Sequence, residues 1–321
     1  MEYKVSILVP IYGVEKYIER CARSLFEQTY HNIEYIFVND CTKDNSIDIL
    51  LTVLEEYPNR KEQVKIVHHE QNRGLSAARN TAVANMTGDY LWHVDSDDWL
   101  EVDAVKKLVS EMEHTVSDVI IMGYNDVKTN YITSNVVLYK DKKSYISGIL
   151  QHTIPGSVWN KFFSAEFYLD SGIRSVEGLN YGEDYAIIPR LLHKAKTIHI
   201  FNEPLYNYNL TNQSSYTHNI NKTSIANVRL AYQLNVDYFV ATTDKELYSD
   251  TISILPFRSM LSLIKNAHKG SYNDIVASFP ECLKNTNVEL SLIDRLILLL
   301  LHLRLYFLLS VIIKVYKRVC W

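Results

Sequence analysis

The first 125 residues alternate between short apolar runs and longer segments with apolar side chains at helical spacing. A short, β-branched apolar run predicts a buried strand, and apolar residues every three or four positions predict a helix packed on it. The predicted strands cover residues 5–10, 33–38, 64–68, 90–94 and 118–122, and the predicted helices cover residues 15–28, 44–57, 75–86 and 102–112. This alternation is typical of βαβ units, so we expect an α/β fold with a mostly parallel sheet flanked by helices.

The pattern loosens after about residue 125. Strands are predicted at residues 131–139 and 197–201, and helices at residues 142–150, 185–193, 219–240 and 247–267. The polar segment 211–220 precedes an all-helical remainder and therefore indicates a boundary. We expect an α/β domain over residues 1–215, with halves 1–125 and 126–215, and a C-terminal helical region over residues 216–321.

Composition excludes several classes of protein. The chain has 321 residues, of which 47% are hydrophobic and 22% charged, which is typical of a globular protein and not of a disordered or repetitive one. The net charge of −4 does not indicate a nucleic-acid binder. The four cysteines form no C-x-x-C pair, so neither a zinc site nor a disulfide framework is expected. The N-terminus has no signal-peptide pattern, so the expected location is cytoplasmic.

Residues 290–321 change this picture. They carry five basic side chains and one acidic one, and they form the most apolar stretch of the chain. Their apolar runs, 296–303 and 305–313, are separated by Arg304, whereas a spanning helix needs about 20 mostly apolar residues and a central arginine is costly in lipid. An amphipathic helix on the membrane surface fits best, and the alternatives are a buried core or dimer helix and a short transmembrane anchor.

Polar residues follow four of the predicted strands: Tyr12, Asp40, Arg73 and the run 95–98. Ligands of open α/β sheets bind beyond the carboxyl ends of the strands, so we expect these four groups to line one edge. In the run 95–98, Asp95, Asp97 and Asp98 crowd three carboxylates together, which favours a hard divalent cation such as Mg²⁺ or Mn²⁺. The alternative is a helix N-cap, a position that suits Asp98.

A second acidic group lies at residues 182–184, directly before a predicted helix. A carboxylate there, Glu183 or Asp184, has the chemistry of a general base, and N-capping is again the alternative. The segment Trp159-Asn160-Lys161 and the tyrosines at 206 and 208 add aromatic and polar groups suited to stacking on a sugar or a base.

Together these segments resemble glycosyltransferase family 2, the inverting nucleotide-sugar transferases of GT-A fold. The resemblance covers about residues 3–210 and is carried by an ordered series of motifs, at residues 5–12, 24–30, 38–46, 72–80, 88–98, 159–161 and 182–184. It implies that residues 1–125 are the nucleotide-binding half and residues 126–215 the acceptor half.

The resemblance also implies roles for single residues. It implies Asp184 as the catalytic base with Glu183 beside it, and Asp97 and Asp95 as ligands of Mn²⁺ or Mg²⁺. The implied contacts with the nucleotide-sugar are Pro10, Tyr12, Asp40, Arg73, Arg79, Asp95, Ser96, Trp159 and Lys161. Asp40 matches the carboxylate that binds a uracil base.

The sequence departs from the family pattern at two places. The family commonly has Asp-Asp-Gly-Ser after the second strand, and this chain has Asn39-Asp40-Cys41-Thr42. The family often has Tyr-x-Tyr-Arg, and here Asn209 replaces the arginine, so we expect Lys161 or His218 to supply a phosphate contact.

The resemblance implies an inverting transfer of a hexosyl or N-acetylhexosaminyl group, with UDP as the expected nucleotide. The implied acceptor is a hydroxyl of a glycan or lipid-linked oligosaccharide of the bacterial surface-polysaccharide type. We further expect a peripheral position on the inner face of the membrane, a homodimer, and no nucleic-acid partner. The alternatives are a nucleotidyltransferase, which would need a Gly-rich phosphate loop after the first strand, and a catalytically silent nucleotide-binding or scaffold protein.

Overall fold

The structure is a computed structural model that describes residues 2–129, 131–212, 220–283 and 290–319. The chain divides into two compact units. The first consists of Met1–Lys142 and Gly156–Gln213, and the second of Lys143–Pro155 and Ser214–Trp321. The division at residues 215 and 216 stays a prediction, and the units differ from it at α5 (Lys142–Leu150), most of which falls in the second unit.

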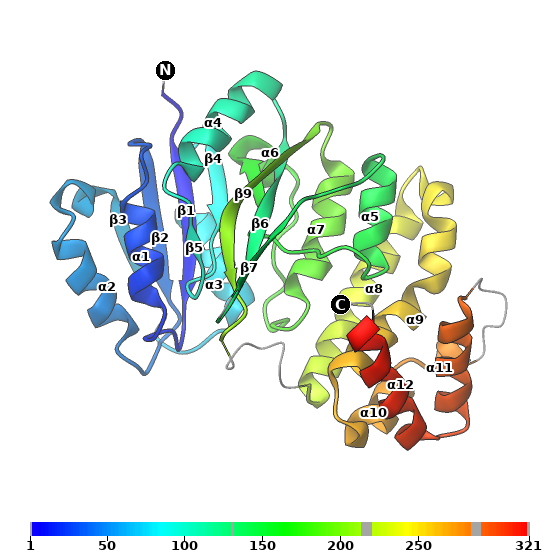
Figure 1. Ribbon diagram of the computed structural model, residues 1–321. Coiled ribbons are helices and arrows are strands. Elements are labelled where there is room, and N and C mark those ends of the chain that lie inside the picture. Colours follow the sequence, from blue (N-terminus) through cyan, green and yellow to red (C-terminus); the bar gives the residue numbers. More distant parts are fainter. Residues whose placement is uncertain (1, 130, 213–219, 284–289, 320–321) are drawn as a thin grey trace. The chain divides into compact units, whose positions relative to one another are not determined.

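The first unit holds the alternating strands and helices expected from the sequence (Figure 1). Its elements are β1 (Val5–Ile11), α1 (Ile18–Phe26), β2 (Ile33–Asn39), α2 (Ser46–Glu55), β3 (Val64–His68), α3 (Leu75–Asn85), β4 (Tyr90–His93), β5 (Trp99–Leu100), α4 (Ala104–Thr115), β6 (Val119–Lys128), β7 (Tyr131–Asn135), β8 (Lys161–Ser164), α6 (Ala165–Asp170), α7 (Glu183–Lys194) and β9 (Ile198–Asn209). The bounds of β3 agree with the prediction, and β5, β8 and α6 were not predicted.

The strands form one sheet in the order β3-β2-β1-β4-β8-β6-β9-β5, with β7 paired to β6. Strands β3, β2, β1 and β4 are parallel, as are β6 and β9. Strand β8 runs antiparallel between β4 and β6, while β5 and β7 are also antiparallel to their neighbours. The sheet is therefore mixed: the parallel arrangement holds for the four strands whose polar ends were expected to share an edge.

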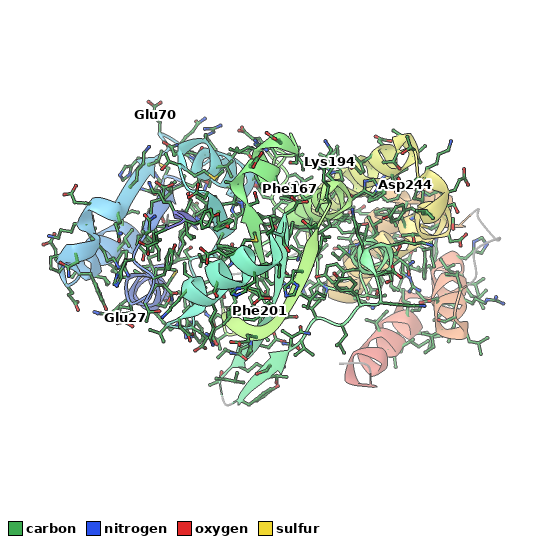
Figure 2. All side chains as sticks on the ribbon, turned by 90° about the horizontal axis from the view of Figure 1, so that it is seen from above. Glu27, Glu70, Phe167, Lys194, Phe201 and Asp244 are labelled. Atoms are coloured by element: carbon green, nitrogen blue, oxygen red, sulfur yellow. The ribbon has the colours of Figure 1, made fainter. Side chains whose placement is uncertain are left out.

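Helices cover both faces of this sheet. Side chains of α1, α2 and α4 join those of β1, β2 and β4 in one core cluster, and α3 contacts β1 and β2 from the other face. Figure 2 shows the side chains filling the space between the sheet and its helices, with Phe201 on β9 packed against the cluster. The strands β1, β2 and β4, whose carboxyl ends form the candidate ligand-binding edge, are thus packed against helices on both faces of the sheet.

The second unit is helical. Besides α5 it contains α8 (Lys222–Ala241), α9 (Ser249–Asn266), α10 (Tyr272–Ser278), α11 (Leu292–His302) and α12 (Tyr306–Val319). Helix α9 packs on α8, and Thr251 of α9 donates a hydrogen bond of 3.0 Å to Ser147 of α5. Among the described residues, every helix is too short or too polar to cross a bilayer.

Candidate active site

The loop after β4 contains the three clustered carboxylates. Asp98 is fully buried, and it accepts hydrogen bonds from the Tyr206 hydroxyl (2.6 Å) and the Asn209 backbone N–H (2.7 Å). Burial, together with the charges of Asp97 and Asp95, raises the pKa of Asp98 well above its usual range. Asp98 therefore ties the loop to β9. The alternative role as a helix N-cap is wrong for Asp98, because β5 follows it and α4 begins only after Asp103.

Asp95 and Asp97 are the remaining carboxylates of this loop. Burial and the charge of Asp95 raise the pKa of Asp97, whose Oδ2 accepts from the Asn212 side chain at 2.8 Å. Arg20 donates to the backbone oxygen of Asp97 at 3.4 Å and lies over the Trp99 ring. Asp95 and Asp97 are both partly buried and both offer carboxylate oxygens, the ligand type that a hard divalent cation prefers.

The candidate cation site would have two carboxylate ligands, and the protein does not supply a complete set of ligands around it. Within the described parts of the chain, no three His, Cys, Asp or Glu side chains converge on a point that would hold a metal ion. A site with two carboxylates is the arrangement expected for Mg²⁺ or a similar ion that completes its coordination with water and substrate phosphates.

Arg79 of α3 connects the two acidic groups. Its side chain is 2% exposed; Nη2 donates to Asp95 Oδ1 at 3.0 Å, and Nη1 donates to Glu183 at 3.0 Å and to Asp184 at 2.5 Å. The three carboxylates stabilise a guanidinium that burial alone would disfavour. Arg79 was predicted to flank the nucleotide, which stays a prediction; the structure places its side chain at the centre of the carboxylate cluster.

Asp184 and Glu183 lie in the first turn of α7. The helix starts at Gly182, whose φ of 80° is left-handed, and neither acid caps the helix with its side chain. Asp184 Oδ2 accepts from the Val158 backbone N–H at 2.9 Å, so both of its oxygens have partners. Burial raises the pKa of Asp184 while Arg79 lowers it, and burial with the charge of Asp184 raises the pKa of Glu183 to about 7.

Asp40 lies at the end of β2, where the sequence predicted the base-binding carboxylate. It is 2% exposed and accepts from the backbone N–H groups of Arg73 (2.8 Å) and Gly74 (2.7 Å), and its Oδ1 lies 2.6 Å from His69 Nδ1. Asp40 therefore fixes the loop that leads into α3. The Arg73 side chain points to Glu177 at 2.9 Å, on the surface.

The other predicted nucleotide contacts differ in exposure. Tyr12 is 48% exposed just beyond β1, whereas Pro10 is buried within that strand and Ser96 is buried in the loop after β4. Of these three, Tyr12 offers a free surface at the sheet edge.

Trp159 and Lys161 are buried. The Trp159 ring is stacked with Tyr206 and Tyr208, at centroid distances of 4.6 and 5.1 Å, so stacking on a sugar would require these rings to move. Lys161 donates to the Ser157 carbonyl (2.5 Å) and to Asn160 Oδ1 (2.7 Å), and burial lowers its pKa to about 7. Both residues lie close to Val158 in the sequence and so stabilise the segment whose Val158 N–H donates to Asp184. The other predicted phosphate contact, His218, lies outside the described residues.

Sequence reasoning missed several groups that hold the site. Arg20 and Asn212 were not singled out, and Tyr206 was expected only to stack on a sugar or a base. The contacts of Tyr206 with Asp98 and of Asn212 with Asp97 join residues 108 and 115 positions apart, so no local signal indicates them. His93 also went unnoticed. It is buried behind Arg79, and burial and the charge of Arg79 lower its pKa to about 3.

Comparison with known proteins identifies the family. The sequence model of Glycosyl transferase family 2 matches residues 6–168. The putative glycosyltransferase EpsH of Bacillus subtilis (strain 168) is 30% identical over 264 residues, which cover 78% of this chain and 74% of EpsH.

Two solved structures share the fold. S. aureus TarS 1-349 in complex with UDP-GlcNAc has a TM-score of 0.72 at 18% identity, over 98% of this chain and 92% of that chain. The mannosyltransferase PcManGT from Pyrobaculum calidifontis, in complex with GDP-Man and Mn²⁺, has a TM-score of 0.56 at 13% identity, over 98% of this chain and 86% of that chain. The chain therefore belongs to glycosyl transferase family 2 and is a glycosyltransferase of GT-A fold.

Proposed function

We propose that this glycosyltransferase moves a hexosyl or N-acetylhexosaminyl group from a UDP-sugar to a hydroxyl of a glycan or lipid-linked oligosaccharide, with inversion at the anomeric carbon. The observation that carries the proposal is the Arg79 cluster, in which Asp95 and Asp184 share one guanidinium at the carboxyl edge of the sheet. A donor held at Asp95 would thus have its sugar close to a carboxylate able to act as a base. The UDP-GlcNAc bound by TarS supports the choice of donor class.

In the proposed reaction Asp184 takes the proton of the acceptor hydroxyl while that oxygen attacks the anomeric carbon. The new glycosidic C–O bond forms as the bond from the anomeric carbon to the diphosphate oxygen breaks, and the bonding electrons leave with the nucleoside diphosphate. Arg79 and the Val158 N–H hold the two oxygens of Asp184, which fixes the direction of its remaining lone pairs. Glu183 shares Arg79 and adds negative charge beside the base.

Asp97 and Asp95 would hold the divalent cation, Mn²⁺ or Mg²⁺. When bound, such a cation neutralises negative charge on the leaving diphosphate. The raised pKa of Asp97 and the Mn²⁺ in PcManGT support this assignment. We expect an excess of chelator to stop transfer by the purified chain, and added Mn²⁺ or Mg²⁺ to restore it; full transfer in the chelator would contradict the assignment.

We also propose a peripheral position on the inner face of the cell membrane, where a lipid-linked acceptor would be presented. The homodimer stays a prediction. The nucleotidyltransferase alternative has no support in the described site, because it gives Asp184 and Glu183 no task. The silent-protein alternative is disfavoured by the membership of a glycosyltransferase family and by the intact carboxylate cluster.

The proposed function is tested by nucleotide release from a panel of UDP- and GDP-sugars with Asp184→Asn as the variant. We expect the variant to lose transfer by about a hundredfold or more while donor affinity stays within a few-fold, because only proton removal is lost. Asp170→Asn on α6, an exposed carboxylate of the same unit, is the control and should keep the activity. Near-normal turnover by Asp184→Asn would remove this residue from the role of base.

A further inference from the structure

Helices α11 and α12 each carry two apolar faces. One face is packed inside the second unit through Ile297, Leu300 and Leu301 of α11 and Leu309 and Ile313 of α12. The other face is open to solvent, and we call it the outer apolar surface. It consists of Leu292, Ile293, Leu296, Leu299, Leu303, Leu305, Phe307, Leu308 and Val311, which are 42–85% exposed. Helices α11 and α12 contact each other, and so many exposed apolar side chains on two neighbouring helices indicate an interaction surface.

The periodicity of the outer apolar surface follows the helices. Leu292, Leu296, Leu299 and Leu303 recur every three or four positions and therefore line one side of α11 and its end. The buried residues Ile297, Leu300 and Leu301 lie on another side of the helix and are covered within the unit. The outer residues are 42–85% exposed, so covering the exposed part of these side chains would gain free energy.

The exposed charges on the stretch that carries this surface have a single sign. The one acidic side chain of residues 290–321, Asp294, is 5% exposed and paired with Arg258 at 3.2 Å. The exposed charged side chains in the described stretch 290–313 are Arg295 and Arg304, both positive. The sequence then adds Lys314, Lys317 and Arg318. Apolar side chains rimmed by exposed cations complement a layer of acyl chains beneath anionic headgroups.

The geometry excludes a transmembrane role for the two helices. Helix α11 has 11 residues and α12 has 14, which correspond to about 16 and 21 Å, whereas the hydrocarbon core of a bilayer is about 30 Å thick. They cannot join into one longer helix, because Arg304 between them has a left-handed φ of 56°. Each helix is instead long enough to lie in the plane of an interface.

We propose that the outer apolar surface of α11 and α12 docks the enzyme onto an anionic phospholipid bilayer. This inference deepens the peripheral location proposed above and rests on that part of the proposed function, but it is independent of the donor and of the acceptor. A second copy of the chain is the less suitable occupant, because a twofold contact would set Arg295 and Arg304 against the same cations with no exposed acid of this stretch to pair them. Anionic headgroups supply that missing charge.

The test is flotation of the full-length chain with vesicles of phosphatidylcholine, alone or mixed with phosphatidylglycerol. The variant Leu296→Ser, Leu299→Ser, Phe307→Ser removes three outer side chains, and we expect it to partition into the mixed vesicles at least about a hundredfold more weakly. The matched control is Val240→Ser, Leu247→Ser, which removes two side chains that are 52% exposed in the same unit but outside the outer apolar surface. The control should float like the wild type.

A second variant, Arg295→Gln with Arg304→Asn, tests the charge. Asparagine tolerates the left-handed backbone at position 304, so folding should be kept. We expect about tenfold weaker binding to the mixed vesicles, and high salt should weaken wild-type binding in the same direction.

Three results would overturn the proposal. They are equal flotation of the triple-serine variant and the wild type, equal binding to vesicles with and without phosphatidylglycerol, and a stable dimer that the triple-serine substitution dissociates while no vesicles are bound. Nucleotide release from the donor, measured on the same samples, separates this outcome from a failure of the proposed transfer reaction. A triple-serine variant that keeps donor turnover but stays at the bottom of the gradient supports the proposal.

Discussion

Arg79 is the residue on which the active site depends most. A buried guanidinium is costly unless carboxylates surround it, and here Asp95, Glu183 and Asp184 do so from two segments of the chain. The planar guanidinium of Arg79 directs two separate nitrogens at acids from two segments, a fixed geometry that the compact ammonium of a lysine does not reproduce. Arg79 therefore holds Asp184, the proposed base, and Asp95 of the loop after β4 on one guanidinium.

The substitutions Arg79→Lys and Arg79→Met test this role. We expect Arg79→Lys to stay folded and bind donor, with kcat lowered about a hundredfold because the base is misplaced. Arg79→Met leaves the acids unpaired and should lower the free energy of unfolding by about 3 kcal/mol or more. Arg23→Met, which removes a surface pair with Glu56, is the control and should change neither quantity appreciably. Wild-type kcat in both Arg79 variants would contradict a positioning role.

At the scale of the element, the site is carried by the connections that follow β1, β2, β3 and β4. The connection after β2 contains a departure from the family pattern. Cys41, where the family commonly has glycine, has a left-handed φ of 56°. Its thiol donates to the Glu70 carbonyl at 3.6 Å, and the chain continues into the turn that Thr42 closes on Asn39. The turn is thus made at a cost in backbone strain that glycine would avoid.

Substitution of Cys41 measures that strain. We expect Cys41→Gly to raise the free energy of unfolding by about 0.5 kcal/mol, because relief of the left-handed strain outweighs the greater freedom of glycine in the unfolded chain. Cys41→Val should lower it by about 1 kcal/mol or more, since a β-branched side chain resists this backbone conformation. Denaturant unfolding with Cys41→Ala as the reference checks both signs. A higher free energy of unfolding for Cys41→Val than for Cys41→Gly would show that the turn is unstrained.

The sequence predicted those elements whose pattern is long and regular. The runs that became β1 to β4 end in polar residues, so the shared edge and the carboxylates at 40, 95 and 97 were identifiable. Asp184 was proposed from the acidic pair before a predicted helix and from the family resemblance. Strands β5 and β8 are two and four residues long and give no periodic signal, which is why the antiparallel part of the sheet was missed. Tyr206, Asn212 and the inward direction of Arg79 depend on which distant segments lie side by side, and local pattern carries no such information.

At the scale of the whole molecule, an excess of buried acid in the first unit is the main electrostatic feature. Burial and mutual repulsion raise the pKa values of Asp97, Asp98, Asp184 and Glu183. A carboxyl with a raised pKa in the folded state binds protons more tightly there than in the unfolded chain. It therefore contributes stability at low pH that is lost as the pH rises.

The pKa of Glu183 sets the pH range over which the folded state should lose this stability. Its pKa is about 7 in the folded chain against an ordinary 4.5, so without donor or metal the melting temperature should fall as the pH rises from about 4.5 to about 7, and level off above. Glu183→Gln removes that group, so the slope should flatten and the variant should melt higher than the wild type at pH 8. Glu177→Gln, on the surface, should keep the wild-type profile. A wild-type slope in Glu183→Gln would place the titration elsewhere.

The distance along the chain between Arg79 and its partners has a consequence for folding. Glu183 and Asp184 are 104 and 105 residues further on, and they follow the end of the segment that the family model matches. During synthesis, the parallel strands β1 to β4 are available long before these acids emerge. Until they emerge, Asp95 is the only one of the three acidic partners of Arg79 that has been synthesised. The carboxylate cluster around Arg79 is thus assembled from residues far apart in the sequence, and such non-local contacts slow folding.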